Sequence, residues 1–298
     1  MAAARRRGRG RGVFRPRQVH IHHPPGDSAN ANVDELHTLK GVRNMKVKSM
    51  LLGIGLLLLI VGGAAIHSQE PPQTPVMAPE AQTVLRQLSE RNKQVKSAVI
   101  RVADTIDDVQ ADGRKLQFAH VRELTILRPD KLKVETTGDV TNRTLWLDGK
   151  TLTVLDRDKK VYAQVPSPGT ISQAVDTLQD KYNMSLPGAD LLSDDIYKTM
   201  TESCDAISYI GLGYAGDEKC HHLAFTGPNI DWQMWISAGA KPTTRKMVIT
   251  YKRLPGQPQY TMQVLKAEEG AKIKDAAFKC EIPKDVEKIE LQPVNQPQ

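Results

Sequence analysis

Short stretches of alternating apolar and polar residues, separated by compact turns, constrain the fold of this chain more than any other feature. The first, SAVIRVADTIDDVQ from residue 97, is followed by the turn ADGRK and then by LQFAHVRELTILR. Asp112-Gly113 and, later, Asp148-Gly149 are dipeptides typical of β-hairpin turns. Because only a few turn residues join each strand to the next, we expect an antiparallel meander and not parallel βαβ units.

Other segments follow the helical period or continue the strand pattern. Apolar residues recur at helical spacing within 79–97 and 169–183, namely Val84, Leu85, Leu88, Val95, Ile171, Ala174, Val175 and Leu178. LPGADLL then ends this helix, and a second short helix follows that runs through Met200. A second run of strands follows, AISYIGLGY, CHHLAFTG, DWQMWIS, TRKMVITYK, QYTMQVLKAE and AAFKCEIP. We therefore predict an α+β fold of about a dozen strands, whose helices cover one face of a large curved sheet.

An unbroken apolar run of 17 residues, Met50–Ile66, follows Lys46 and Lys48 and precedes a proline-rich stretch. This order is that of a secretory signal peptide that begins at Met45 and is cleaved after Ser68. The run is at the low edge of the about 17–25 residues that span a bilayer, so an uncleaved inner-membrane anchor over residues 50–66 is the alternative. Either reading places the following residues in the periplasm.

The charge distribution separates the leader from the rest of the chain. Of the formal charge of +7, +8 lies in residues 1–68, so residues 69–298 carry −1. A nucleic-acid partner for the folded part therefore loses its main support. We expect a disordered basic extension at 1–44 if translation starts at Met1, no such extension if it starts at Met45, and a signal peptide or anchor at 45–68. A proline-rich linker at 69–79, a β-domain at 80–285 and a flexible tail at 286–298 follow.

Three cysteines, Cys204, Cys220 and Cys280, lie beyond the apolar run. In an oxidising compartment they allow at most one disulfide, and its pairing stays open. The sequence Cys220-His221-His222 is not expected to bind a metal, because successive strand residues point to opposite faces. We predict no metal site, no cofactor and no catalytic residue.

Two sets of segments resemble known families. DGRKLQFAHVRELTILRPDKLKVET and LWLDGKTLTVLDRDKKVYAQVP resemble the core of the LolA/LolB-like periplasmic lipoprotein carriers. LPGADLL, GDEKCHHLAF, DWQMWI, KPTTRKMVITYK and PGQPQYT resemble an uncharacterised bacterial family of predicted periplasmic proteins within that superfamily. The resemblance spans about residues 79–283. It implies an unclosed β-barrel, a strongly bent antiparallel sheet capped by helices, with an apolar cavity that holds acyl chains in the carriers.

Alternation along the predicted strands assigns a set of side chains to the inner face of the sheet. The candidates for lining a cavity are Leu152, Val154, His221, Leu223, Phe225, Trp232, Met234, Ile236, Met247 and Ile249. These side chains could instead fill a core. An aromatic content of 5% and the neighbouring Met and Trp residues favour a cavity for apolar ligands. His221 could bind a head group, act as a general base, or be hydrogen-bonded within the core.

We therefore expect an exported envelope protein, not an enzyme, that binds or carries a lipid or the acyl chains of a lipoprotein in a concave sheet. The alternative is an interaction or sensor module, tethered to the inner membrane, that binds an envelope protein and transports no ligand. A hydrolase that uses His221 is a third hypothesis, and no nucleophile motif supports it.

Overall fold

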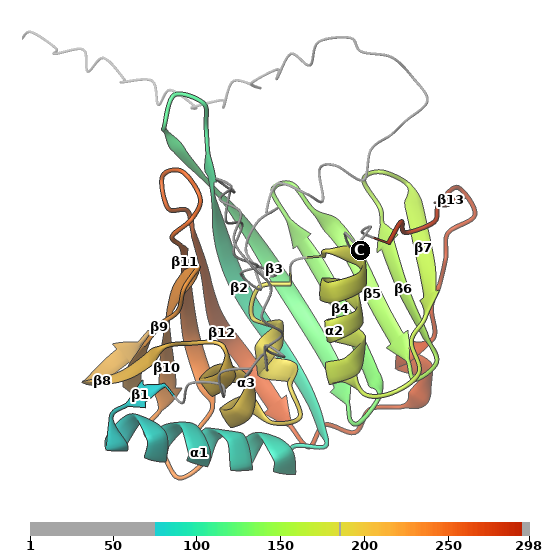
Figure 1. Ribbon diagram of the computed structural model, residues 1–298. Coiled ribbons are helices and arrows are strands. Elements are labelled where there is room, and N and C mark those ends of the chain that lie inside the picture. Colours follow the sequence, from blue (N-terminus) through green and yellow to red (C-terminus); the bar gives the residue numbers. More distant parts are fainter. Residues whose placement is uncertain (1–74, 185, 294–298) are drawn as a thin grey trace, which may run out of the picture. The chain divides into compact units, whose positions relative to one another are not determined.

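All strands in the described part of the chain belong to one sheet (Figure 1). The structure, a computed structural model, describes residues 75–184 and 186–293. The strands are β1 (Val76–Met77), β2 (Ser97–Val109), β3 (Lys115–Leu127), β4 (Lys131–Gly138), β5 (Asn142–Asp148), β6 (Thr151–Asp156), β7 (Val161–Pro166), β8 (Ala206–Ala215), β9 (Glu218–Thr226), β10 (Ile230–Ser237), β11 (Thr244–Tyr251), β12 (Gln259–Glu269) and β13 (Glu287–Lys288). Their order in the sheet is β1-β8-β9-β10-β11-β12-β2-β3-β4-β5-β6-β7-β13.

The predicted antiparallel meander is confirmed. The strands from β2 to β7 and from β8 to β12 pair with their neighbours in sequence, and β12 pairs with β2. Gly113 and Gly149 adopt φ of +83° and +93° in the two Asp-Gly turns, a conformation that favours glycine. The short end strands β1 and β13 run parallel to β8 and β7. The end strands do not pair with each other, so the curved sheet stays open (Figure 1).

Three α-helices lie on the concave side of the sheet, as the sequence predicted: α1 (Pro79–Gln94), α2 (Ile171–Tyr182) and α3 (Ile196–Glu202). Helix α1 begins with Pro79, whose missing N–H costs nothing in the first turn. Helix α2 begins with a capping box, in which the Thr170 hydroxyl accepts from the backbone N–H of Gln173, while the Gln173 side chain accepts from the backbone N–H of Thr170.

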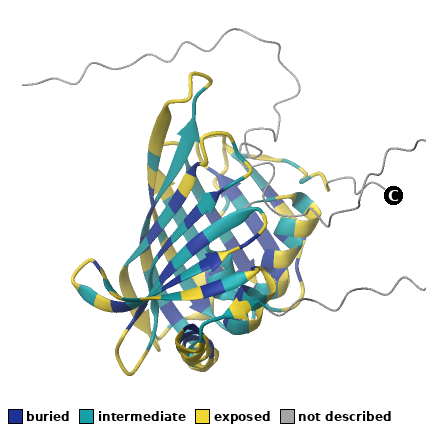
Figure 2. Cartoon of the chain, turned by 60° about the vertical axis from the view of Figure 1, so that its left-hand side comes forward, coloured by how far each residue is buried: buried dark blue, intermediate teal, exposed yellow. Residues whose placement is uncertain are grey.

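The helices divide the core into two clusters. Helices α1 and α3 pack on the half of the sheet formed by β8–β12, together with Val102 of β2. Helix α2 packs on β3–β7. Figure 2 shows that buried residues occupy the middle of many strands, whereas the hairpin tips are exposed. The region of the concave face between the two clusters is therefore the part with the least helical cover.

Some segments differ from the expectation. Residues within AAFKCEIP were predicted to form a strand, which is wrong, because Asp275–Phe278 form the 3-10 helix η3, anchored by buried Phe278. LPGADLL contributes a separate 3-10 turn, η2 (Ala189–Leu192), before α3. Strand β13 lies within residues 286–298, expected to be a tail, and pairs with β7. The predicted extension, leader and most of the linker lie outside the described residues.

Candidate functional site

The ten residues predicted to line a cavity lie on the concave side of the sheet. Eight of them form three rows of direct cross-strand neighbours on β9, β10 and β11: Phe225, Trp232 and Ile249; Leu223, Met234 and Met247; His221 and Ile236. The other two, Leu152 and Val154, lie on β6, on the face that packs against α2 and its cluster. The period-two pattern thus assigned these side chains to one face.

Most of these residues are packed beneath helices. Leu152 belongs to the cluster under α2. Seven more belong to the cluster under α1 and α3, namely Leu223, Phe225, Trp232, Met234, Ile236, Met247 and Ile249. Val154 and His221 alone among the ten are half-buried. Surface that a ligand could reach on this face must therefore lie mainly beside these rows.

His221 is engaged by a neighbouring strand. Its Nδ1 lies 3.0 Å from the hydroxyl of Tyr209 on β8, and the two rings are tilted against each other. Tyr209 itself packs against the cluster under α1 and α3. This arrangement orients the imidazole at the margin of the core.

An uncovered apolar row lies between the two clusters. Ile100, Leu124, Val134, Leu145 and Val154 are direct cross-strand neighbours on β2, β3, β4, β5 and β6. We call this row the central strip. All five side chains pack against the cluster under α2, yet each residue is only half-buried. The strip is thus apolar surface that the helices leave partly open.

A segment that joins α2 to α3 crosses this region of the concave face (Figure 1). We call residues 184 and 186–193 the strap. Met184, Leu186 and Leu192 pack against the cluster under α2, whereas Leu191 packs against the other cluster. None of these strap residues is buried. The strap therefore contributes further half-buried apolar side chains in contact with both clusters.

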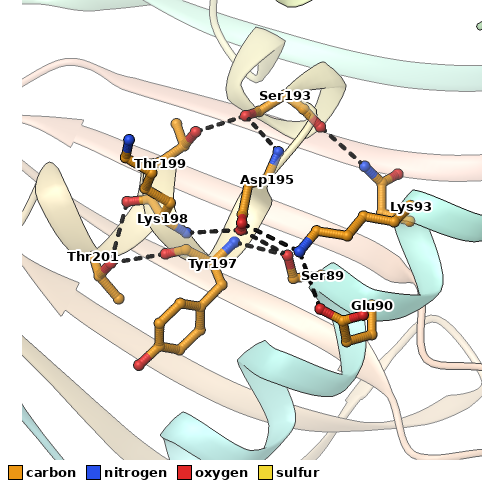
Figure 3. Close-up of polar contacts among 10 residues, drawn as sticks. Ser89, Glu90, Lys93, Ser193, Asp195, Tyr197, Lys198, Thr199 and Thr201 are labelled. Atoms are coloured by element: carbon orange, nitrogen blue, oxygen red, sulfur yellow. Dashed lines mark hydrogen bonds and ion pairs between the residues drawn. The ribbon is translucent and has the colours of Figure 1, made fainter. Parts of the chain in front are cut away.

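Polar contacts hold the C-terminal end of the strap and the first turn of α3 against α1 (Figure 3). Asp195 accepts hydrogen bonds from the backbone N–H of Lys198 at 3.1 Å and from the Ser89 hydroxyl at 3.0 Å. The Nζ of Lys93 lies 3.2 Å from the same carboxylate. Burial alone would raise the pKa of Asp195, but the hydrogen bonds outweigh it and hold that pKa below its usual value. One end of the strap is thereby pinned.

A row of polar side chains borders the central strip on β3–β6, two residues away from the strip residue of each strand. Arg122, Thr136, Arg143 and Asp156 are direct cross-strand neighbours on β3, β4, β5 and β6. Arg143 donates through Nε to Asp156 at 2.7 Å. We call these four residues the polar row. On β3–β6 the concave face therefore changes from apolar to polar between side chains that are two residues apart.

Buried groups on neighbouring strands hold Arg122. Its terminal nitrogens lie 3.1 Å from the Tyr260 hydroxyl and 3.2 Å from Oδ1 of Asp104. The Nδ1 of His120 lies 3.1 Å from the same oxygen. Burial raises the pKa of Tyr260, so its neutral hydroxyl accepts from the guanidinium. The Asp104 side chain is 0% exposed, and its Oδ2 has no hydrogen-bond partner in the described part of the chain.

The two arginines were not predicted as site residues, although the sequence carries a signal for both. Alternation in FAHVRELTI places Arg122 on the same face as Leu124, and RTLWL places Arg143 with Leu145. Charged residues on the apolar face of a strand are unusual unless they are paired. The pattern could not show which length of each strand the helices cover, so the central strip was also missed, apart from Val154.

The three cysteines are free, with Cys204 and Cys220 buried and Cys280 half-buried. Burial raises the pKa of Cys204 to about 11. Over residues 75–184 and 186–293, no three His, Cys, Asp or Glu side chains are placed to hold a metal ion. Within the same ranges, every helix is too short or too polar to cross a bilayer. The apolar run at 50–66 lies outside the described residues.

Comparisons with known proteins place the chain in a family. None of the curated proteins matches it. Similar solved structures include an uncharacterized conserved protein from Thermus thermophilus, at 10% identity and a TM-score of 0.43, covering 71% of this chain and 99% of that one. A LolA superfamily protein from Nitrosomonas europaea is 12% identical with a TM-score of 0.33, covering 67% of this chain and 97% of that one.

A chain of the Pseudomonas aeruginosa MucA/MucB complex is 11% identical with a TM-score of 0.37, and the match covers 68% of this chain and 61% of that one. All these scores are below 0.5, so none of these similarities indicates a function for this chain. The model of a family described as predicted periplasmic protein (DUF2092) matches residues 81–292, and the chain belongs to this family.

Proposed function

We propose that this protein is exported to the periplasm and binds an apolar ligand, a lipid or the acyl chains of a lipoprotein, on the concave face of its sheet. The central strip carries the proposal. It lies on the same face as two buried clusters, yet its five side chains remain half-buried. A contiguous apolar row that no helix covers fully is typical of a binding surface.

The dimensions and energetics of the strip suit an acyl chain. Five neighbouring strands at a spacing of about 4.8 Å make a row roughly 19 Å long. At about 0.8 kcal/mol per buried methylene, a chain of a dozen carbons would gain roughly 10 kcal/mol before ordering costs. The apolar strap residues Met184, Leu186, Leu191 and Leu192 would pack over the ligand, since they already border both clusters. Binding of this kind needs no catalytic group.

Mass spectrometry of organic extracts from the purified protein tests this proposal. We expect wild-type protein to retain lipid, and Leu145→Gln to retain much less, because the amide places a polar group on the strip. Leu265→Gln is the matched control, since Leu265 is 52% exposed on β12 and lies outside the strip. The absence of lipid from wild-type protein, or equal amounts in the two variants, would contradict the proposal.

The free edge of β8 favours a second candidate function, an interaction module for an envelope protein. Strand β1 pairs with Ala206 and Ile207 alone, so Ser208–Ala215 have no strand partner on that side within the described residues. Ile210, Leu212 and Tyr214 are 58%, 55% and 66% exposed, and this segment carries no charge. Unprotected edges of this kind accept an extended strand from another protein.

Photo-cross-linking from position 212 in cells tests the second candidate, with position 265 as the control. A partner captured from position 212 alone would support it, whereas equal products from both positions would refute it. N-terminal sequencing of the native protein tests the tether at residues 50–66, because a mature start at Gln69 would remove it.

A further inference from the structure

The polar row presents positive charge toward the central strip. The side chains of Arg122 and Arg143 are 24% and 27% exposed, whereas those of their acidic partners Asp104 and Asp156 are 0% and 12% exposed. Each pair is close to neutral as a whole, but the acids lie beneath and the guanidinium groups face outward. The polar row runs beside the strip, so a ligand on the strip would have cationic hydrogen-bond donors along one side, next to β3 and β5.

Both arginines keep donors to spare. A guanidinium carries five N–H donors in a planar fork that matches a carboxylate or phosphate. Arg143 uses Nε for Asp156, and its terminal amino groups have no acceptor within the described residues. Arg122 is fixed in place by Tyr260 and Asp104 through its terminal nitrogens, which still carry further N–H groups. One arginine is thus rigidly positioned and the other is largely free to bind.

The two arginines are close enough to act together. They lie on β3 and β5, on either side of Thr136 in β4, at directly paired positions. Strand spacing puts their backbones roughly 10 Å apart, a distance that two arginine side chains bridge around one oxyanion. The hydroxyl of Thr136, half-buried between them, adds a donor.

We propose that the ligand is an anionic amphiphile, whose carboxylate or phosphate head group is bound by Arg122 and Arg143 while its apolar chain lies along the central strip. This inference rests on the proposed function and specifies its ligand class. The Asp156 carboxylate, which accepts from Nε of Arg143, repels an anionic head group bound at the terminal amino groups of the same guanidinium. Removal of that carboxylate should therefore strengthen binding of the anion.

Calorimetric titration of the purified, delipidated protein with decyl phosphate, decanol and inorganic phosphate tests the inference. We expect decyl phosphate to bind about tenfold tighter than decanol, as one or two charge-assisted hydrogen bonds provide. Inorganic phosphate should bind far more weakly than either, because it makes no contact with the strip. Equal affinity for decyl phosphate and decanol would overturn the head-group site and leave the proposed function standing.

Variants separate the contributions of the polar row. Arg143→Gln should weaken decyl phosphate about tenfold and change decanol less than about twofold. Asp156→Asn should strengthen decyl phosphate severalfold. Arg101→Gln, on the exposed opposite face of β2, is the control and should change neither. Arg143 is the better target, because loss of Arg122 would remove the guanidinium that lies against the buried Asp104 carboxylate and would destabilise the fold.

Other outcomes are equally decisive. Inorganic phosphate that binds as tightly as decyl phosphate would show a site for free phosphate and would refute the amphiphile. If neither decanol nor decyl phosphate binds, the proposed function itself falls. If Asp156→Asn leaves the affinity for decyl phosphate unchanged, the head group does not reach Arg143 and the inference is wrong.

Discussion

Two leucines on one strand test whether the central strip is open. Leu145 and Leu147 both lie on the concave face of β5, two residues apart. Leu147 is 1% exposed beneath α2, whereas Leu145 is half-buried on the strip. The same substitution, Leu→Ala, therefore compares a core position with a strip position on the same strand and the same face.

The expected magnitudes differ by about 2 kcal/mol. Leu→Ala removes three carbons, and at a fully buried site the lost transfer energy and the remaining cavity together cost about 3–5 kcal/mol. At a half-buried site the transfer term falls to about 1 kcal/mol, and solvent or neighbours fill the space. We therefore expect Leu147→Ala to lower the free energy of unfolding by about 3 kcal/mol or more, and Leu145→Ala by about 1 kcal/mol.

Urea denaturation of the delipidated protein measures the difference. With a slope of about 2–3 kcal/mol per molar urea, Leu147→Ala should lower the midpoint by about 1 M or more and Leu145→Ala by less than about 0.5 M. Circular dichroism and tryptophan fluorescence should give the same midpoints. Equal shifts for both variants would mean that Leu145 is core, and the case for an open strip would then fail.

Three further predictions concern the framework around the face. Asp195→Ala should cost about 1 kcal/mol at pH 7 through loss of the α3 cap, measured by urea denaturation. Because the pKa of Asp195 is lowered in the folded protein, its charge stabilises the fold above its unfolded pKa of about 4, and this contribution is lost as the pH falls through the folded pKa. The gap between wild type and Asp195→Ala should therefore shrink at pH 3, and a constant gap would contradict this. Thr170→Ala, which removes the cap of α2, should lower the free energy of unfolding by about 0.5–2 kcal/mol. Burial raises the pKa of Cys280 and raises that of Cys204 to about 11, so iodoacetamide at pH 8 should modify half-buried Cys280 before buried Cys204, as peptide mass mapping would show. Faster labelling of Cys204 would mean that the α3 end of the core opens readily.

The sequence contained most of the information on the fold. The Asp-Gly pairs fixed two hairpins, because their glycines adopt the positive φ that these turns require. The helical spacing of Val84, Leu85 and Leu88 predicted the buried face of α1. Phe278 shows the limit of such patterns. A single anchoring aromatic in a short apolar run is compatible with a strand, yet here it holds a 3-10 turn against the core.

The candidate site was only partly predictable, because burial depends on where the helices lie. Leu152 and Val154 are alike in sequence pattern, but α2 covers the first and leaves the second half-buried. The inward position of Arg143 follows from alternation, whereas its pairing with Asp156 requires the register between β5 and β6. The gradient from apolar to polar across the face is a property of the assembled sheet.

The position of β2 affects the order in which the sheet can form. Strand β2 pairs with β3, which follows it directly, and with β12, which lies far along the sequence. The strands from β2 to β7 can associate early through local contacts, whereas β8–β11 join them in the sheet only when β12 pairs with β2. Until then one edge of β2 is exposed to other chains, so a folding polypeptide of this kind would depend on protection by a holding chaperone.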